Sequence, residues 1–387
     1  MGIGFFEKNV HVAMPARLVL VCFILLTLAA CSDSKQIKVQ PGAPAEDDSK
    51  GKSQEERLST ENWKMPIKVP EGEFFKVFGW LDDSTLIYAS NLESTSNLYS
   101  YSLEKGESSL IVQTDHPIAE VSLNQDRTMI LVHTSSSSYE AIVDIYSIDG
   151  IKISGQSFPS TELHAEWNPY RPTVASIVAF NDDWTFHAYR MDAAEKTVEE
   201  MTLPDPFVEW IGENKIAYLD WNEETPSITA PIVLEEIGEK AQIAGMENIY
   251  RIESFKNALL TVSADGGNTE KAVFTFYDKE LKEYNSFSMP HLSSFSGWLV
   301  PYMDFNEEKK LFAVFEPARS GEADTYTEGF TLVVHSERDS SGRRVFMEGI
   351  DNQPILSSPN GKVYLYGFRY EKIIDIETKK ILHLVKE

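Results

Sequence analysis

The apolar positions of this chain recur in a fixed pattern from about residue 74 to the C-terminus. Each unit has an apolar segment that ends at an anchor residue, a polar turn, a second apolar segment, and two weaker segments in which apolar and polar residues alternate. Alternation is typical of half-buried strands, and short unbroken apolar runs are typical of strands covered on both faces. The pattern therefore predicts units of four strands, with anchors at Trp80, Leu123, Trp167, Trp210, Ser254, Phe305 and Leu356.

The spacing of the anchors predicts the fold class. Successive anchors are about 43, 44, 43, 44, 51 and 51 residues apart, and a period in the forties built from four short strands is the signature of a β-propeller. No long segment has the 3.6-residue periodicity of helical repeats. We predict an all-β propeller with seven blades, or with six, because two units are long and the fourth strand at 199–203 is weak. Residues Trp63 to Val69 could add a strand to the last blade.

The N-terminus has the features of a secretory signal. Leu18 to Ala30 is an apolar run of 13 residues, which is shorter than the roughly 20 residues of a membrane-spanning helix. The run ends in Leu28-Ala29-Ala30-Cys31, which resembles the bacterial lipobox, whose cysteine receives a diacylglyceryl group. We therefore expect a lipoprotein signal peptide at 1–30, a lipidated Cys31 with a disordered acidic tether at 31–62, and a β-propeller domain at 63–387.

The lipobox and the repeats together resemble a known family, the YqgU-like β-propeller lipoproteins of Bacillus-type Gram-positive bacteria. The resemblance rests on Leu28-Ala29-Ala30-Cys31 and on the repeating units across about 74–387. It implies a propeller, described as six-bladed in that family, that is held by a diacylglyceryl anchor at the extracytoplasmic face of the cell membrane. It implies no activity.

Composition and charge narrow the range of partners. The chain has 387 residues, with 60 acidic and 35 basic side chains and a formal net charge of −25. Such a chain repels polyphosphate, so nucleic acid is not an expected partner. Of its 2 cysteines, one lies inside the signal and the other is the lipobox cysteine. The expected folded part therefore has no cysteine for a disulfide, a thiolate zinc site or a nucleophile.

The candidate site lies in the links that join each fourth strand to the next first strand. The sequence has no phosphate-binding glycine loop, no H-E-x-x-H and no G-x-S-x-G motif. In a propeller these links surround one mouth of the central channel, and converging carboxylates there would favour Ca²⁺ or a basic partner. Alternatively, they reflect only the abundance of acids in this chain. No other cofactor is expected. The link residues are Asp115, His116, Glu162, His164, Asp205, Glu247 and Asp351.

Two tryptophans outside the anchors, Trp184 and Trp298, are candidates for exposed aromatic contacts. Together these features indicate a non-catalytic binding or scaffolding module for an envelope protein, a peptide or a wall component. One alternative is a hydrolase or lyase that acts on a cell-wall-associated glycan through paired carboxylates. A second alternative is an envelope assembly factor that pairs the edge of an outer strand with a client strand.

Overall fold

The structure is a computed structural model that describes residues 60–386, except 222–223, 225–226, 267, 295–296 and 337–338. Leu58–Glu387 form one compact unit. The predicted signal peptide, Cys31 and residues 32–59 of the predicted tether lie outside the described residues. Residues 60–62, predicted as the disordered end of the tether, instead form a short helix in which Thr60 is buried. In the part that is described, the helices are the short 3-10 helices η1 (Thr60–Asn62) and η2 (Ala323–Thr325), and none is long and apolar enough to cross a membrane.

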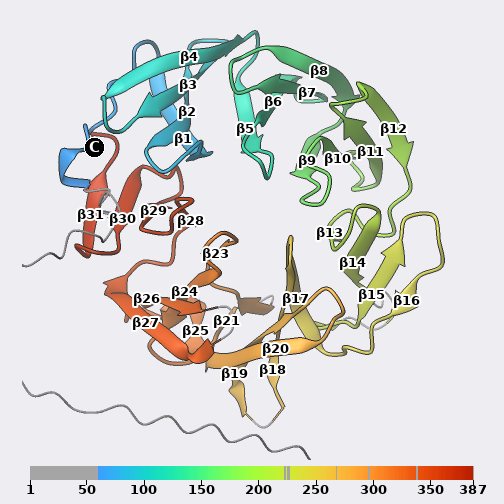
Figure 1. Ribbon diagram of the computed structural model, residues 1–387. Coiled ribbons are helices and arrows are strands. Elements are labelled where there is room, and N and C mark those ends of the chain that lie inside the picture. Colours follow the sequence, from blue (N-terminus) through green and yellow to red (C-terminus); the bar gives the residue numbers. More distant parts are fainter. Residues whose placement is uncertain are drawn as a thin grey trace, which may run out of the picture. The chain divides into compact units, whose positions relative to one another are not determined.

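Seven four-stranded sheets follow one another around a central axis (Figure 1). Blades 1 to 4 contain β1 (Glu73–Trp80), β2 (Thr85–Asn91), β3 (Ser96–Ser102), β4 (Glu107–Thr114); β5 (Ile118–Leu123), β6 (Met129–Ser137), β7 (Glu140–Ser147), β8 (Lys152–Pro159); β9 (Glu162–Trp167), β10 (Val174–Phe180), β11 (Phe186–Asp192), β12 (Thr197–Met201); and β13 (Glu209–Trp210), β14 (Lys215–Leu219), β15 (Ile232–Glu236), β16 (Gln242–Ile243). Blades 5 to 7 contain β17 (Ile249–Phe255), β18 (Ala258–Asp265), β19 (Asn268–Tyr277), β20 (Glu283–Pro290); β23 (Met303–Asn306), β24 (Leu311–Pro317), β26 (Phe330–Ser336), β27 (Asp339–Ile350); and β28 (Ile355–Ser357), β29 (Val363–Tyr366), β30 (Lys372–Asp375), β31 (Lys380–His383).

The blade number agrees with the seven units counted in the sequence. Strands of each blade pair antiparallel in chain order, and the first strand is the innermost (Figure 1). The weak segment at 199–203 contributes to β12, which pairs with β11 as a complete fourth strand. Blade 4 also ends in a fourth strand, although β16 has only 2 residues. The two long units, blades 5 and 6, each form one four-stranded sheet.

Hydrophobic packing between the blades explains why the sheets stack. The second strand of a blade is buried along nearly its whole length, as in β2 and β10, because neighbouring blades cover both of its faces. The aromatic anchors are buried against the preceding blade: Trp80, Trp167, Trp210 and Phe305. The indole Nε1 of Trp80 also donates to the Leu356 carbonyl of blade 7 at 3.2 Å.

The connections lie on two opposite faces, which we name the loop face and the turn face. The loop face carries the links between blades and the loops between second and third strands. The turn face carries the hairpins between first and second strands and between third and fourth strands. A small extra sheet, which the sequence pattern did not predict, joins two connections of the loop face. In it β21 (Leu292–Ser294) and β22 (Gly297–Leu299), in the link before blade 6, pair with β25 (Gly321–Glu322) from a loop of that blade.

The ring closes differently from the prediction for Trp63 to Val69. This segment adds no strand, because the C-terminal residues supply all four strands of blade 7, including the outermost strand β31. Residues 60–69, which we call the clasp, instead connect blades 1 and 7. Within the clasp, the Lys64 N–H donates to the Leu103 carbonyl at 2.7 Å and the Ile67 N–H donates to the Leu384 carbonyl at 2.8 Å.

Candidate functional site

Three of the predicted site residues meet on the loop face where blade 3 joins blade 4. The ring of His164, on β9, contacts Phe207 at 6.2 Å between centroids, and Phe207 stacks on Phe180 at 5.8 Å. Phe180 also contacts Trp184 at 6.2 Å. Asp205 accepts a hydrogen bond of 2.7 Å from the Phe207 N–H and so fixes the shape of the link. The patch is centred on Phe207, which the sequence analysis did not single out.

Glu162 lies beside this patch, because it is on the same strand as His164 and is the cross-strand partner of Phe180. The remaining link residues belong to three other links: Asp115 with His116, Glu247, and Asp351. Within the described ranges, no hydrogen bond or ion pair joins the side chains of these link residues to one another. No three His, Cys, Asp or Glu side chains of the described residues are grouped so that they could hold a metal ion. The expected convergence on a calcium site is therefore not found in this part of the chain, because each acid belongs to its own link around a wide ring.

Trp298 differs from the expectation of an exposed aromatic side chain. Its ring is stacked between His291, at 4.3 Å, and Tyr250, at 5.0 Å between centroids. The Tyr250 hydroxyl accepts a hydrogen bond from the Trp298 N–H and donates one to the Trp298 carbonyl, both at 2.8 Å. The extra sheet explains this burial, because its strand β22 brings Trp298 onto blade 5. Trp298 instead borders a pocket of about 490 Å³ together with Trp221 and Ile228.

Exposed aromatic side chains gather on the loop face. Trp184 and Phe207 are 72% and 65% exposed, the largest values among the exposed aromatic rings of the described residues together with Tyr139 at 66%. Every exposed aromatic ring of the described residues lies in a link or in a loop between second and third strands: Tyr139, Trp184, Phe207, Trp221, Tyr302 and Phe368. Aromatic residues concentrated on one surface are typical of interaction sites.

The loop face is also acidic. Asp or Glu recurs in most of its loops and links, whereas the basic residues in their described parts are Arg319 and Arg369. Arg319 already forms an ion pair of 2.6 Å with Glu328, and the Arg369 guanidinium lies 5.4 Å from the centroid of the Phe74 ring. The remaining negative charge favours a basic partner and speeds its approach.

A second candidate site lies at the turn-face end of the channel, and the sequence analysis missed it. In four successive blades, the residue immediately before the anchor is acidic: Glu166, Glu209, Glu253 and Asp304. The other three blades have Gly79, Ser122 and Ile355 at this position. The signal was present in the aligned repeats, because a polar residue at the same place in consecutive innermost strands must face the same part of the channel. We call these four residues the acidic half-ring.

Backbone groups of the next blade hold two members of the acidic half-ring. The Ser254 N–H of blade 5 donates to the Glu209 carboxylate at 2.7 Å. The Ser357 N–H of blade 7 donates to the Asp304 carboxylate at 3.0 Å. Glu253 instead forms an ion pair within its own strand, with 3.4 Å between the Arg251 Nη2 and the Glu253 Oε2.

Burial raises the pKa of these carboxyl groups. The pKa of Glu166 is raised to about 8 by burial and further by the nearby carboxylates of Glu209 and Glu253. Burial raises the pKa of Glu253 to about 7, against the opposing effect of Arg251, and it raises the pKa of Asp304 to about 6. At neutral pH the acidic half-ring therefore retains protons that solvent-exposed carboxyl groups would have lost.

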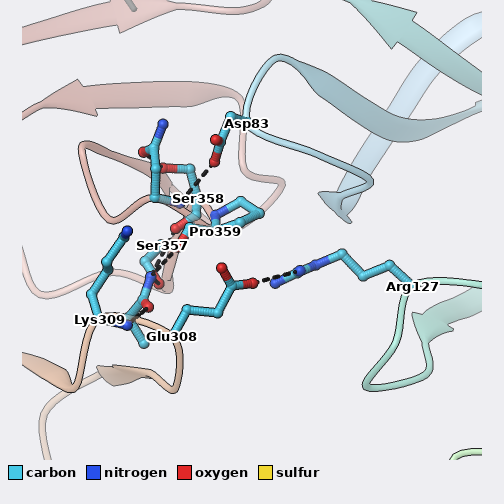
Figure 2. A network of polar contacts seen from close by, with 9 residues as sticks. Asp83, Arg127, Glu308, Lys309, Ser357, Ser358 and Pro359 are labelled. Atoms are coloured by element: carbon cyan, nitrogen blue, oxygen red, sulfur yellow. Dashed lines mark hydrogen bonds and ion pairs between the residues drawn. The ribbon is translucent and has the colours of Figure 1, made fainter. Parts of the chain in front are cut away.

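The acidic half-ring opens into a cavity of about 490 Å³, which we call the channel cavity. Glu166 and Asp304 line it, together with the aromatic rings of Phe78, Trp80, Trp167, Phe255 and Phe305. Figure 2 shows Arg127 of blade 2 reaching Glu308 of blade 6, with 3.0 Å between the Arg127 Nη1 and the Glu308 Oε1. Because these two blades are not neighbours, the ion pair crosses the mouth of the cavity.

Hydrogen bonds also join neighbouring hairpins of the turn face beside this ion pair (Figure 2). The Asn306 side-chain amide donates to the Ser358 carbonyl at 2.8 Å, which connects blade 6 to blade 7. The Asn360 N–H donates to the Asp83 carboxylate at 2.7 Å, which connects blade 7 to blade 1. Hydrogen bonds between hairpins of neighbouring blades therefore fix the rim of the channel cavity.

Comparison with known proteins supports this architecture. The model of the YqgU-like 6-bladed beta propeller domain matches residues 102–367. The chain is 28% identical over 377 residues to the uncharacterized lipoprotein YqgU of Bacillus subtilis (strain 168), covering 95% of this chain and 98% of that protein. The crystal structure of the uncharacterized protein lmo1340 from Listeria monocytogenes EGD-e has a TM-score of 0.75 at 23% identity, covering 83% of this chain and 97% of that one.

A more distant structure shares only the fold. The β-propeller domain of the Trilobed protease from Pyrococcus furiosus, described as having an open velcro topology, has a TM-score of 0.55 at 11% identity and covers 81% of this chain and 98% of that one. The family description names six blades, whereas the described residues of this chain form seven four-stranded sheets. With its match over more than half of the sequence, this chain belongs to the YqgU-like β-propeller domain family.

Proposed function

We propose that this protein is a membrane-anchored lipoprotein whose propeller binds another component of the cell envelope on the extracytoplasmic side. The anchor is supported by the lipobox at Cys31 and by the lipoprotein name of the Bacillus subtilis relative. The binding role rests on one observation, the gathering of exposed aromatic rings on the acidic loop face. A rigid propeller that presents variable loops is well suited to recognition without catalysis.

The chemistry of the loop face favours a basic protein or peptide as the partner. Aromatic rings supply contact area at little cost in side-chain entropy, and the surrounding acids attract positive charge. Both arginines of the loop face are already engaged, Arg319 with Glu328 and Arg369 with the Phe74 ring. The acids of the loop face therefore outnumber its basic side chains, and this excess of negative charge favours lysines and arginines of a partner. A wall polymer is the second possible ligand, since sugar rings also stack on exposed aromatic side chains.

Proximity crosslinking of the full chain in its native membrane, followed by mass spectrometry, tests this proposal. The double variant Trp184→Ala/Phe207→Ala should reduce the recovery of a specific partner by about tenfold or more, because central aromatic contacts dominate many interfaces. Recovery should also fall as the salt concentration rises, because the attraction between charged surfaces is screened.

A matched control separates this patch from general loss of apolar surface. Leu110, on the outer strand β4, is 57% exposed, and Ile151, in a hairpin of the turn face, is 68% exposed. The variant Leu110→Ala/Ile151→Ala should leave recovery unchanged. Equal loss in both double variants, or a partner that binds both as well as it binds the native chain, would rule out the loop face as the binding surface.

The acidic half-ring supports a second candidate function, a hydrolase acting on a wall-associated glycan. Glu166 and Asp304 both line the channel cavity, and burial raises the pKa of each. A carboxyl group that stays protonated near neutral pH can act as a general acid beside an ionised partner. Release of reducing ends from purified wall glycan, lost in both Glu166→Gln and Asp304→Asn, would favour this function. No release by the native chain would exclude it for that substrate.

A further inference from the structure

One carboxylate of the acidic half-ring has no partner. Glu166 is largely buried, and it lines the channel cavity. Within the described residues no hydrogen bond or ion pair reaches its carboxylate, whereas Glu209 and Asp304 each accept a backbone N–H from the next blade. An enclosed polar group is costly unless a ligand or water satisfies it.

The walls of the channel cavity suit an organic group. Its volume of about 490 Å³ lies within the range of small-molecule sites. Five aromatic rings line it beside the carboxylates, and the faces of such rings attract cations. The chain already uses this attraction at the rim, where the Lys310 ammonium lies 5.6 Å from the centroid of the Phe305 ring.

The acidic groups of the cavity can pair with a positively charged ligand. Glu166, Asp304 and Glu307 line it, and the carboxylates of Glu209 on blade 4 and Glu253 on blade 5 act on Glu166. The basic residues of the wall are Arg127 and Lys256. Arg127 is already paired with Glu308, so Lys256 is the remaining basic side chain of the wall. Acids therefore outnumber the available bases at this end of the channel.

We propose that the channel cavity binds an organic cation, with an ammonium group on an alkyl chain held by Glu166 and the methylene groups packed against the aromatic wall. Linear polyamines and lysine side chains of peptides share this chemistry. The acids stand on different blades, so an elongated cation can reach several of them in turn. The site lies at the opposite end of the channel from the loop face and does not depend on the partner proposed above.

Isothermal titration of the full chain at pH 7 tests this site, with spermidine and a tri-lysine peptide as the probes. Because the pKa of Glu166 is about 8 in the free protein, a bound ammonium group should displace its proton. The measured enthalpy should then differ between buffers of different ionisation enthalpy. Glu166→Gln should weaken binding by about tenfold or more and remove the dependence on the buffer.

Glu162→Gln is the matched control, since Glu162 lies on the same strand and the same side as Glu166 but at the loop-face end. It should change the affinity by less than about twofold. Tighter binding of the peptide would assign the site to lysine side chains, and tighter binding of spermidine would assign it to free polyamines. The proposal is overturned if neither probe gives heat, if only CaCl₂ does, or if Glu166→Gln binds like the native chain. Loop-face variants should leave this binding intact, which separates the two proposals.

Discussion

Asparagine side chains perform two roles at the hairpins of the turn face. The Asn306 Oδ1 accepts the Lys309 N–H of its own turn at 2.8 Å, while its amide nitrogen donates to the Ser358 carbonyl of blade 7. Asn168 repeats the arrangement between blades 3 and 4, with its amide nitrogen 3.0 Å from the Glu213 carbonyl. One buried side chain thus shapes a hairpin and fastens it to the next blade.

Replacing Asn306 by alanine should therefore destabilise the propeller. We expect the free energy of unfolding in urea to fall by about 1–3 kcal/mol, because buried hydrogen-bonding groups of two blades lose their partner. Asn306→Asp keeps the acceptor but loses the donor, and it should also destabilise the fold. Asn214 has an exposed side chain, so Asn214→Ala should have little effect. Equal stability of Asn306→Ala and the native chain would contradict the double role.

Glu166 should make the stability of the protein depend on pH. Its pKa is raised to about 8 in the folded chain, above the ordinary value of about 4.3. The folded state therefore keeps a proton that the unfolded state loses, so this contribution to stability is complete at acidic pH and is lost as the pH rises through about 8. Calorimetry should show a Tm that falls between pH 5 and 9.

Glu166→Gln should flatten this pH profile and raise the Tm at pH 9, because an amide has no proton to lose. The Tm of this variant should still fall slightly as the pH rises, because burial also raises the pKa values of Glu253 and Asp304. Glu162→Gln should retain the native profile. An unchanged slope in Glu166→Gln would show that its carboxyl group is not held protonated.

The clasp is the element that distinguishes the closure of this ring. Trp63 is 8% exposed and packs with Trp80 of blade 1 at 6.4 Å between ring centroids, in a cluster that also contains Leu365 and Leu384 of blade 7. The Tyr101 hydroxyl donates to the Lys64 carbonyl. The last residues before blade 1 therefore contribute to the core and hold the first and last blades together.

Trp63→Ala should lower the free energy of unfolding by about 3–5 kcal/mol, as is typical when a buried tryptophan is truncated. Trp184→Ala is the natural comparison, since that ring is 72% exposed and its loss should cost less than about 1 kcal/mol. Denaturant unfolding followed by tryptophan fluorescence would measure both. If the two variants were equally stable, the clasp would not be part of the folding unit.

At the scale of the whole molecule, the proposed lipid anchor would hold the propeller at the membrane. If Cys31 carries the lipid, Cys31→Ala should move the chain from the membrane fraction to the soluble fraction, because the acyl chains supply the membrane affinity. Fractionation followed by blotting measures the change, and intact mass should show the loss of the diacylglyceryl group. Cys22→Ala, which alters the other cysteine, should keep the native distribution. Membrane association of Cys31→Ala would contradict the anchor.

The net charge of the protein is also a property of the whole molecule. With a formal charge of −25, the protein is repelled by anionic headgroups, so a tether of about 30 residues would keep it clear of the bilayer surface. The loop face concentrates acids, while its arginines are already engaged. If the loop face binds the proposed basic partner, the distribution of charge should matter more to that binding than the total charge.

The sequence by itself determined the blades, because each strand carries its own hydrophobic period and the anchors recur at a nearly constant interval. It therefore predicted the all-β propeller and its seven units, with six blades as the alternative, from the spacing of anchors such as Trp80 and Trp210. It also contained the acidic residue before the anchor in four units, which becomes meaningful only once the units are known to surround one channel.

Only the tertiary structure decided which side chains meet. It brought Phe207 to His164 and Phe180, stacked Trp298 between His291 and Tyr250, turned the clasp away from strand pairing, and left the Glu166 carboxylate without a partner among the described residues. These outcomes depend on contacts between residues far apart in the chain, and on the desolvation that such contacts cause. A local pattern of apolar and polar residues has no information about either.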